Sequence, residues 1–302
     1  MNINGFMKAL ATQTTSKETR RAYRQDLEKY QAFLRSKGLR VTDATASTIN
    51  EFIAHLAARR GAPLAPATIT RRLAVLSEFY EFLGEQSGGT ITNPVKRVKR
   101  PRVDNDLPRA VADDVLGRLI EGITDKRDKA MILTCVWGGL RLSELRQLDL
   151  TTLTSRKHTA PDGTVEYYGV GEVIGKGRKR RQFLVGPAAL QALTDYITEC
   201  RKNDTSGPLF LSQRKQRISA RMIQETVNKW CLKLGLPHIH IHQLRHSYAT
   251  RNVNAGMPAP VLQQLLGHKS LSSSQRYFRV SPERLTREYF SVMEFLRQGS
   301  PV

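Results

Sequence analysis

The sequence predicts two mainly α-helical domains, the second of which also contains a small antiparallel β-sheet. Apolar residues recur at helical spacing through most of the 302 residues. Between residues 88 and 108 this period stops, and glycine, proline and basic pairs take its place, as is typical of an exposed linker. β-Forming residues cluster only between residues 165 and 185. We therefore expect a helical domain at 1–93, a basic linker at 94–108 and a second domain at 109–302.

The first domain is expected to contain three amphipathic helices. Helical spacing begins at residue 16, with Tyr23 and Leu34 in its apolar stripe, and the pair at 37–38 ends the helix. A second helix is expected over 48–59, and a third begins after Pro66. The apolar stripes are predicted core positions. The opposite face of the third helix carries Arg71 and Arg72, which either meet solvent or contact the backbone of DNA.

The second domain is expected to begin and end with helices on either side of the sheet. A Pro-Asp-Gly turn at 161–163 and β-forming residues around Gly175-Lys176-Gly177 predict the antiparallel strands. The predicted helices of this domain cover 112–121, 126–137, 140–148, 187–200, 219–234, 242–254, 258–266, 273–278 and 282–297.

The charge of the chain indicates a polyanionic partner. Lys and Arg total 48 against 27 Asp and Glu, giving a formal net charge of +21 that is spread over the full length. Nucleic acid is the simplest partner for such a basic surface, although a basic soluble protein without that function is the alternative. The densest basic run covers 96–102 and either crosses a phosphate backbone or resembles a nuclear-localisation patch.

Cysteine usage and hydropathy indicate a cytoplasmic protein. Cys135, Cys200 and Cys231 form no C-x-x-C pair, and their odd number argues against a disulfide framework. The N-terminus lacks the pattern of a signal peptide, and no stretch of about 18 uncharged apolar residues exists. We therefore expect neither secretion nor membrane insertion.

Four histidines within nine residues form the first candidate site. On a helix, His242 and Arg245 share a face, so an imidazole and a guanidinium can contact one phosphate together. His246 follows one turn after His242, and either imidazole can be the active one. His238 and His240 suggest a metal cluster, but no Cys or carboxylate stands near them and H-E-x-x-H is absent.

Three further positions have ordinary explanations when each is taken alone. Gly175-Lys176 fails as a phosphate-binding P-loop, because Val170 and Gly177 occupy positions that the motif gives to glycine and to serine or threonine. Lys176 is then a lysine at a hairpin tip. Arg141 with Glu144 describes a surface ion pair, and an isolated tyrosine such as Tyr277 is usually structural.

Taken together, these segments resemble the tyrosine recombinases, nearest in style to the Xer and the phage or transposon integrase members. Order and spacing both fit, and residues 67–82 with the Asn-Pro pair at 93–94 also look like that family's core-binding domain. The segments that carry the resemblance are Gly139-Leu140-Arg141-Leu142-Ser143-Glu144-Leu145, Gly175-Lys176-Gly177, His242-Gln243-Leu244-Arg245-His246, Leu265-Leu266-Gly267-His268 and Gln275-Arg276-Tyr277.

The resemblance implies a two-domain DNA clamp, with a SAM-like core-binding domain at 1–93 and a catalytic domain at 109–302. In this reading Arg141 and Arg245 match the two arginines that grip the scissile phosphate, a task that suits the planar fork of a guanidinium. His268 matches the position that hydrogen-bonds the phosphate. Glu144 matches a supporting position that orients the arginine and imidazole groups.

The resemblance also implies the residues that move protons and form the covalent bond. Tyr277 matches the nucleophile, and its hydroxyl needs a nearby base because the unperturbed pKa of tyrosine is about 10. His242 matches that base. Lys176 matches the hairpin lysine that protonates the departing 5′ oxygen.

Basic residues of both domains are candidates for contact with the DNA backbone. They are Arg71, Arg72, Lys96, Arg97, Lys99, Arg100, Arg178 and Lys179.

The implied activity is site-specific DNA recombination through a 3′-phosphotyrosyl intermediate and a Holliday junction, with no cofactor and no metal. The implied partners are double-stranded DNA with paired half-sites and either three further copies of the chain or a related recombinase subunit. Residues 282–297 are expected to dock on a neighbouring protomer or to pack on their own domain. Chromosome dimer resolution, phage integration, transposition and cointegrate resolution remain open as settings.

Two other activities remain open, and one segment departs from the family pattern. The same chemistry can relax DNA, as in type IB topoisomerases, and the same fold can serve as a non-catalytic DNA-binding accessory protein. Between residues 149 and 175 the chain is longer than the compact Xer-like pattern, with an apparent insertion at 155–163. Arg156 and Lys157 in this segment either reach the phosphate backbone or belong to a tolerated surface loop.

Overall fold

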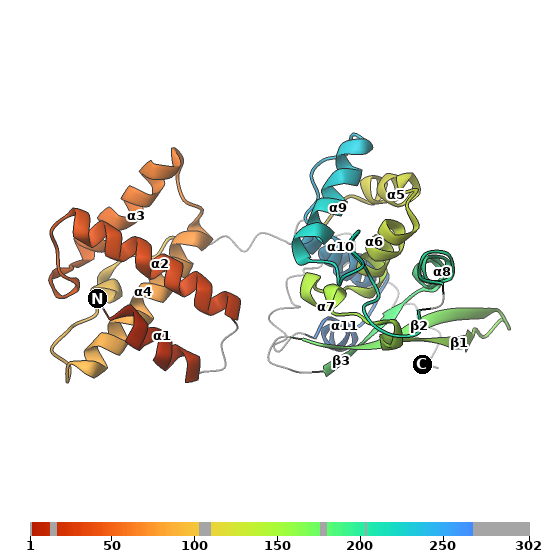
Figure 1. Cartoon of the computed structure of the whole chain (residues 1–302), viewed down its shortest axis with the longest axis horizontal. Helices are drawn as coiled ribbons and strands as arrows, with labels where there is room; N and C mark the ends of the chain where they lie inside the picture. The colour runs from red at the N-terminus through yellow and green to blue at the C-terminus, as the bar shows by residue number, and fades with distance from the viewer. Residues whose placement is uncertain (1, 13–16, 103–109, 176–179, 203, 268–302) are drawn as a thin grey trace, which may run out of the picture. The chain divides into compact units, whose positions relative to one another are not determined.

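The computed structural model describes residues 2–12, 17–102, 110–175, 180–202 and 204–267, and the chain divides into two units between Asn105 and Asp106 (Figure 1). The first unit is helical, and the second combines helices with a three-stranded sheet. The predicted fold class is therefore confirmed.

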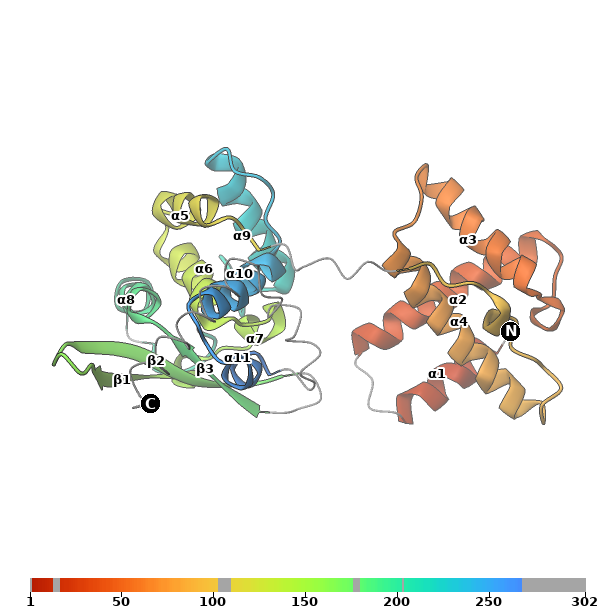
Figure 2. The same cartoon turned by 180° about the vertical axis from the view of Figure 1, so that it is seen from behind.

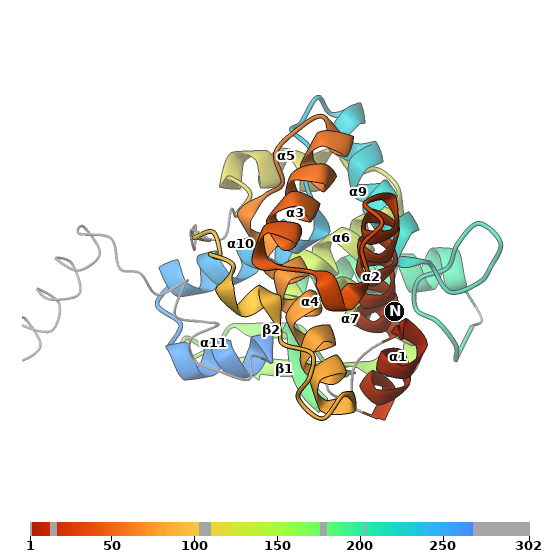
Figure 3. The same ribbon diagram turned by 90° about the vertical axis from the view of Figure 1, so that its left-hand side faces the viewer.

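The described residues of the N-terminal unit form the helices α1 (Ile3–Thr12), α2 (Lys17–Ser36), α3 (Ala46–Arg60) and α4 (Pro66–Gln86). Helix α2 packs against α1 and α4, and the short 3₁₀ turn η2 (Pro94–Arg97) packs against α3 and α4 (Figure 3). The three predicted helices correspond to α2, α3 and α4. Helix α1 was not predicted, and it contributes the buried side chains of Phe6 and Leu10 to the core.

Two buried tyrosines are joined by a hydrogen bond in the core of this unit. The hydroxyl groups of Tyr30 and Tyr80 lie 2.7 Å apart, and the Tyr80 hydroxyl donates to the carbonyl of Val41 at 3.0 Å. Burial raises the pKa of Tyr30 to about 12 and also raises the pKa of Tyr80, so both phenols are neutral. Val95 and Val98 are buried in the same core. The beginning of the predicted linker is therefore packed against the helices.

Helix α6 lies in the core of the C-terminal unit, and its residues from Ala130 to Val136 are all buried. A helix that is apolar on every side belongs inside a core. Helix α6 packs against α8, α10 and strand β3 (Figure 2). The helices are α5 (Asp113–Gly122), α6 (Lys126–Gly138), α7 (Leu142–Arg146), α8 (Pro187–Tyr196), α9 (Ala220–Lys233), α10 (Ile241–Asn254) and α11 (Ala259–Leu266), and the π-helical turn Ile197–Arg201 follows α8.

The sheet is an antiparallel meander of β1 (Leu153–Thr159), β2 (Val165–Ile174) and β3 (Arg180–Val185), in the order β1-β2-β3. Pairing of β2 with β3 runs from Gly169 opposite Val185 to Ile174 opposite Arg180. Burial alternates along β3, so that Arg181, Phe183 and Val185 face the core. Strand β3 packs against α6 and α11, and β2 packs against α8.

Two expected segments of the second domain differ in the structure. Residues 155–159, interpreted above as part of an inserted loop, belong to strand β1, which pairs with β2 along its whole length. Helix α7 is also shorter than the predicted helix over 140–148. It begins only at Leu142, after the left-handed turn at Gly139 that ends α6, and it ends at Arg146. The helices predicted at 273–278 and 282–297 lie outside the described residues.

Candidate active site

Arg141 is held at the start of α7 by a tight turn. Gly139 has φ +57°, and a Cβ atom at this position would overlap the ring of Tyr248. Glycine is therefore the residue that permits this close approach. Two residues later, the backbone N–H of Arg141 donates to Oε2 of Glu144 at 2.8 Å. The side-chain Nη1 of Arg141 donates to Oε1 of the same carboxylate at 2.7 Å. The predicted pair of Arg141 and Glu144 is thus formed, and it caps the helix.

Glu144 is buried among three arginines. Besides Arg141, Arg181 of β3 donates from Nη2 to Oε2 at 2.6 Å, and Nη1 of Arg245 lies 3.8 Å from Oε2. Burial disfavours the charged carboxylate, but the hydrogen bonds and charge of Arg181, followed by those of Arg141, hold the pKa of Glu144 below its ordinary value. Glu144 is therefore ionised at neutral pH.

Arg245 enters the same cluster from α10, and its side chain is only 5% exposed. Its Nη1 donates to the carbonyl of Gly139, and its Nη2 donates to the carbonyl of Leu266 at 2.6 Å. The guanidinium is thus held by the ends of two helices.

Arg141 reaches the end of α11 as well, because its Nη2 donates to the carbonyl of Gly267 at 3.2 Å. The cluster therefore joins α6, α7, α10, α11 and β3 at one place. Three guanidinium groups surround a single carboxylate, and the local charge is positive. Such a site favours an anion with several acceptor oxygens, such as a phosphate group.

His242 lies on α10 at the edge of this cluster, and its side chain is exposed. Partial desolvation of the ring, followed by the charges of Arg245 and Arg141, lowers the pKa of His242. A lowered pKa leaves the imidazole neutral at neutral pH, which is the form that accepts a proton. The expected sharing of one helix face by His242 and Arg245 agrees with this arrangement.

The other histidines of this region line a pocket of about 650 Å³ together with His242. The rings of His238 and His240 lie 4.4 Å apart between centroids, and those of His242 and His246 lie 6.0 Å apart. Within the part of the chain that the structure describes, no three His, Cys, Asp or Glu side chains are arranged to share a metal ion.

The candidate DNA contacts on the N-terminal unit differ in exposure and in whether they form ion pairs. Arg71 and Arg72 both form ion pairs with the buried carboxylate of Asp26. The side chain of Arg72 is only 13% exposed, so most of it is withdrawn from solvent. Lys96 forms an ion pair with Glu81 at 2.9 Å. The three remaining candidates of this unit are exposed, and they are Arg97, Lys99 and Arg100.

Five of the predicted site residues lie outside the described residues. They are Lys176, Arg178, Lys179, His268 and Tyr277. The structure brings together Arg141, Arg245 and His242, the remaining members of the predicted catalytic set, with the predicted supporting residue Glu144.

Arg181 belongs to the cluster but was not identified from the sequence. It follows Arg178 and Lys179, which were predicted to contact DNA, in a continuous run of basic residues at 178–181. The signal that identifies it is the period of two along β3, since Arg181 shares a face with Phe183 and Val185. An arginine on the apolar face of a strand needs a buried partner, and Glu144 is that partner.

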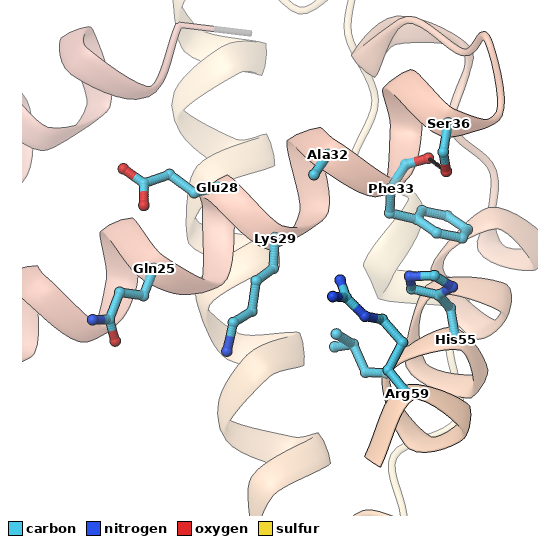
Figure 4. Close-up of a pocket in the computed structure, with 9 residues that line it drawn as sticks. Gln25, Glu28, Lys29, Ala32, Phe33, Ser36, His55 and Arg59 are labelled. Carbon is cyan, nitrogen blue, oxygen red and sulfur yellow. Dashed lines mark hydrogen bonds between the residues drawn. The ribbon is translucent and has the colours of Figure 1, made fainter. Parts of the chain in front are cut away.

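A second pocket of about 620 Å³ lies in the N-terminal unit between α2 and α3. Figure 4 shows His55 and Arg59 of α3 beside Phe33 of α2, and the rings of Phe33 and His55 lie 5.3 Å apart. None of the residues predicted for catalysis or DNA contact lines it. This pocket is therefore not part of the candidate active site.

Within the described residues, no helix has the length and apolar character needed to cross a membrane.

Comparisons with known proteins give one consistent family. Residues 109–284 match the model of the phage integrase family, and residues 3–87 match its N-terminal SAM-like domain. Tyrosine recombinase XerC of Chromohalobacter salexigens is 33% identical, and the alignment covers 99% of this chain and 97% of that protein.

Two solved structures share the fold. The XerH site-specific recombinase bound to a palindromic difH substrate aligns with a TM-score of 0.72 at 20% identity, over 91% of this chain and 80% of that one. The integrase of the transposon Tn1549, in complex with a circular intermediate DNA, aligns with a TM-score of 0.70 at 18% identity, over 96% and 98% of the two chains.

Proposed function

Since the chain belongs to the phage integrase family of tyrosine recombinases, we propose that it is a site-specific recombinase that cleaves and rejoins DNA through Tyr277. The observation that best supports the proposal is the convergence of Arg141 and Arg245 on one buried carboxylate, Glu144. These arginines come from distant parts of the chain and match the two phosphate-gripping positions of the family. Neither DNA relaxation alone nor a non-catalytic accessory role is favoured by the relatives.

In the proposed reaction, the Tyr277 hydroxyl attacks the scissile phosphorus and the bond to the 5′ oxygen breaks. Arg141 and Arg245 stabilise the additional negative charge that the phosphoryl oxygens carry in the transition state. His268 donates a further hydrogen bond to the phosphate. The preformed positions of the two guanidinium groups mean that little reorganisation accompanies the reaction.

Two proton transfers complete this step. Neutral His242 accepts the proton of the Tyr277 hydroxyl, and Lys176 gives a proton to the departing 5′ oxygen. The products are a 3′-phosphotyrosyl bond and a free 5′ hydroxyl. Attack by the 5′ hydroxyl of a second strand reverses the chemistry and exchanges the strands, through a Holliday junction.

The proposed assembly is a cytoplasmic synapse of four protomers, of one or of two related kinds, on two DNA duplexes with paired half-sites. The N-terminal and C-terminal domains, at 1–93 and 109–302 with the basic linker between them, together clamp the duplex. Arg97, Lys99 and Arg100 are exposed and contact the phosphate backbone, as do Arg178 and Lys179. Arg71, Arg72 and Lys96 contribute through the part of each side chain that its acidic partner leaves accessible. Transposition is one setting for this reaction.

A covalent trapping experiment tests the proposed nucleophile. The protein is incubated with nicked duplexes built from inverted repeats that flank its gene, and covalent complexes are separated on denaturing gels. We expect the native protein to form an adduct, because loss of the nicked fragment prevents religation. Tyr277→Phe should form none while still binding the duplex. An adduct that persists in this variant would show that another residue is the nucleophile.

A further inference from the structure

Arg181 is a buried arginine that contacts the carboxylate of Glu144. Its side chain is only 6% exposed. Because arginine is rarely buried without a partner, its contacts indicate what it does. Two of its nitrogens donate to Glu144, Nη2 to Oε2 at 2.6 Å and Nε to Oε1 at 3.4 Å. Arg181 therefore holds both oxygens of the carboxylate that also holds Arg141.

The same guanidinium reaches the ends of two helices. Its Nη1 donates to the carbonyl of Leu265 in the last turn of α11, and its Nη2 lies 3.5 Å from the carbonyl of Gly139. Gly267, which ends α11 with φ +61°, lies against the stem of this side chain, and a Cβ atom there would come within 2.5 Å of its Cδ. Gly267 also accepts a hydrogen bond from Arg141.

We propose that Arg181 is a positioning residue for DNA cleavage: it holds Glu144, and through Glu144 it sets the guanidinium of Arg141 against the scissile phosphate. This role rests on the proposed function and adds a residue that touches neither phosphate nor nucleophile. Its bond to the Leu265 carbonyl holds the Arg181 guanidinium in place against Glu144.

Lysine cannot replace these contacts. A single ammonium group can bind one carboxylate oxygen, whereas the guanidinium spans the carboxylate and two carbonyls in a fixed plane. We therefore expect Arg181→Lys to retain a folded domain with a charged partner for Glu144, but with Arg141 poorly placed. Misplacement by about 1 Å can slow a reaction roughly 100-fold.

Arg180→Lys is the matched control, because Arg180 lies next to Arg181 on β3 but points to solvent and pairs with the exposed Glu172. The measurement is the single-turnover rate of adduct formation at saturating DNA, with the DNA dissociation constant and melting temperature of each variant. For Arg181→Lys we expect a rate about 10- to 100-fold lower, with DNA affinity within about threefold of the native value. Arg180→Lys should keep the rate within about twofold, as expected for a surface change.

A double-mutant cycle with Glu144→Gln separates positioning from simple charge neutralisation. If Arg181 acts through Glu144, adding Arg181→Lys to Glu144→Gln should slow the reaction by less than about threefold more, since the two changes remove one interaction. Equal losses in both backgrounds would overturn the proposal. So would a native rate in Arg181→Lys, or a loss confined to DNA affinity.

Failure to fold would also be decisive. If both Arg181→Lys and Arg181→Met lose cooperative thermal unfolding, the side chain is needed for folding and the positioning role is wrong. Absence of any adduct with the native protein that binds the duplex would instead contradict the proposed function itself. A native adduct together with an unaffected Arg181→Lys variant contradicts only the role of Arg181.

Discussion

At the scale of single residues, the charge of Glu144 determines how the arginines are arranged. Its carboxylate accepts from the backbone of Arg141 and from the side chains of Arg141 and Arg181. A buried carboxylate of this kind directs guanidinium groups that would otherwise repel one another. The remaining positive charge is then available to a phosphate group.

The first prediction concerns the protonation of His242. Since the pKa of His242 is lowered, the free enzyme should keep the neutral base down to a pH below the ordinary histidine value of 6.5. The second-order rate constant for adduct formation, measured at low DNA concentration, should therefore fall on acidification with a midpoint below 6.5.

Two variants test whether protonation of His242 causes this fall in rate at acidic pH, which is the acid limb of the pH profile. His242→Gln should react about 100-fold more slowly or worse and should lose the limb. His246→Gln should retain both the rate and the limb. Loss of the limb in His246→Gln, or a midpoint above the ordinary histidine value, would contradict the assignment of the base.

At the scale of elements, periodicity predicted most helices because their apolar stripes are regular. Helix α2, with Leu27 and Tyr30 buried on one face, is an example. Strand β1 was not predicted, because its residues from Thr154 to Thr159 are exposed and carry no apolar alternation. Its extended conformation comes from backbone pairing with β2, which the local sequence does not indicate.

The sequence predicted those residues of the candidate site that belong to recognisable motifs, and it missed Arg181. Arg141, Glu144, His242 and Arg245 were singled out from residue type and spacing, and the family resemblance supplied their roles. Their spacing along α7 and α10 agrees with the structure. Arg181 escaped notice because it follows other basic residues, and its burial depends on packing between β3 and α11. A carbonyl partner such as Leu265 cannot be inferred from residue identity.

The second prediction concerns the outer half of the β1–β2 hairpin. Replacing residues 158–166 with Asn-Gly would join Lys157 to Tyr167, which already face each other in the pairing. The removed residues are exposed except for the partly buried Ala160, so the free energy of unfolding should change by no more than about 1 kcal/mol. Chemical denaturation measures this change.

Phe183→Ala provides the comparison, since Phe183 is fully buried on β3. It should lower the free energy of unfolding by about 3 to 5 kcal/mol. A hairpin replacement as damaging as Phe183→Ala would show that the outer hairpin has a structural role that its exposure does not reveal.

At the scale of the whole molecule, the net charge of +21 predicts strongly salt-dependent binding to DNA. Each neutralised phosphate contributes about −0.9 to the slope of log K against log salt. Exposed Arg97, Lys99 and Arg100 are predicted to supply three of these contacts. Changing all three to Gln should therefore reduce the magnitude of the slope by about 2 to 3.

Arg221→Gln is a control for this measurement, because Arg221 is exposed on α9 and paired with Glu225 but was not among the predicted contacts. Its slope should match that of the native protein. If the triple variant also keeps the native slope, the basic run is solvated surface and the proposed contacts of the linker are wrong.

The central claim is that Tyr277 becomes joined to a DNA 3′ phosphate, and the most direct test is to identify the linkage in the trapped adduct. Digestion with protease and nuclease, followed by mass spectrometry, locates the modified residue, and enzymatic labelling detects a free 5′ hydroxyl on the released strand. We predict a nucleotide 3′-phosphate on the peptide that contains Tyr277 and a released 5′ hydroxyl. A modification on another residue, or a linkage to the 5′ end of the DNA, would contradict the account.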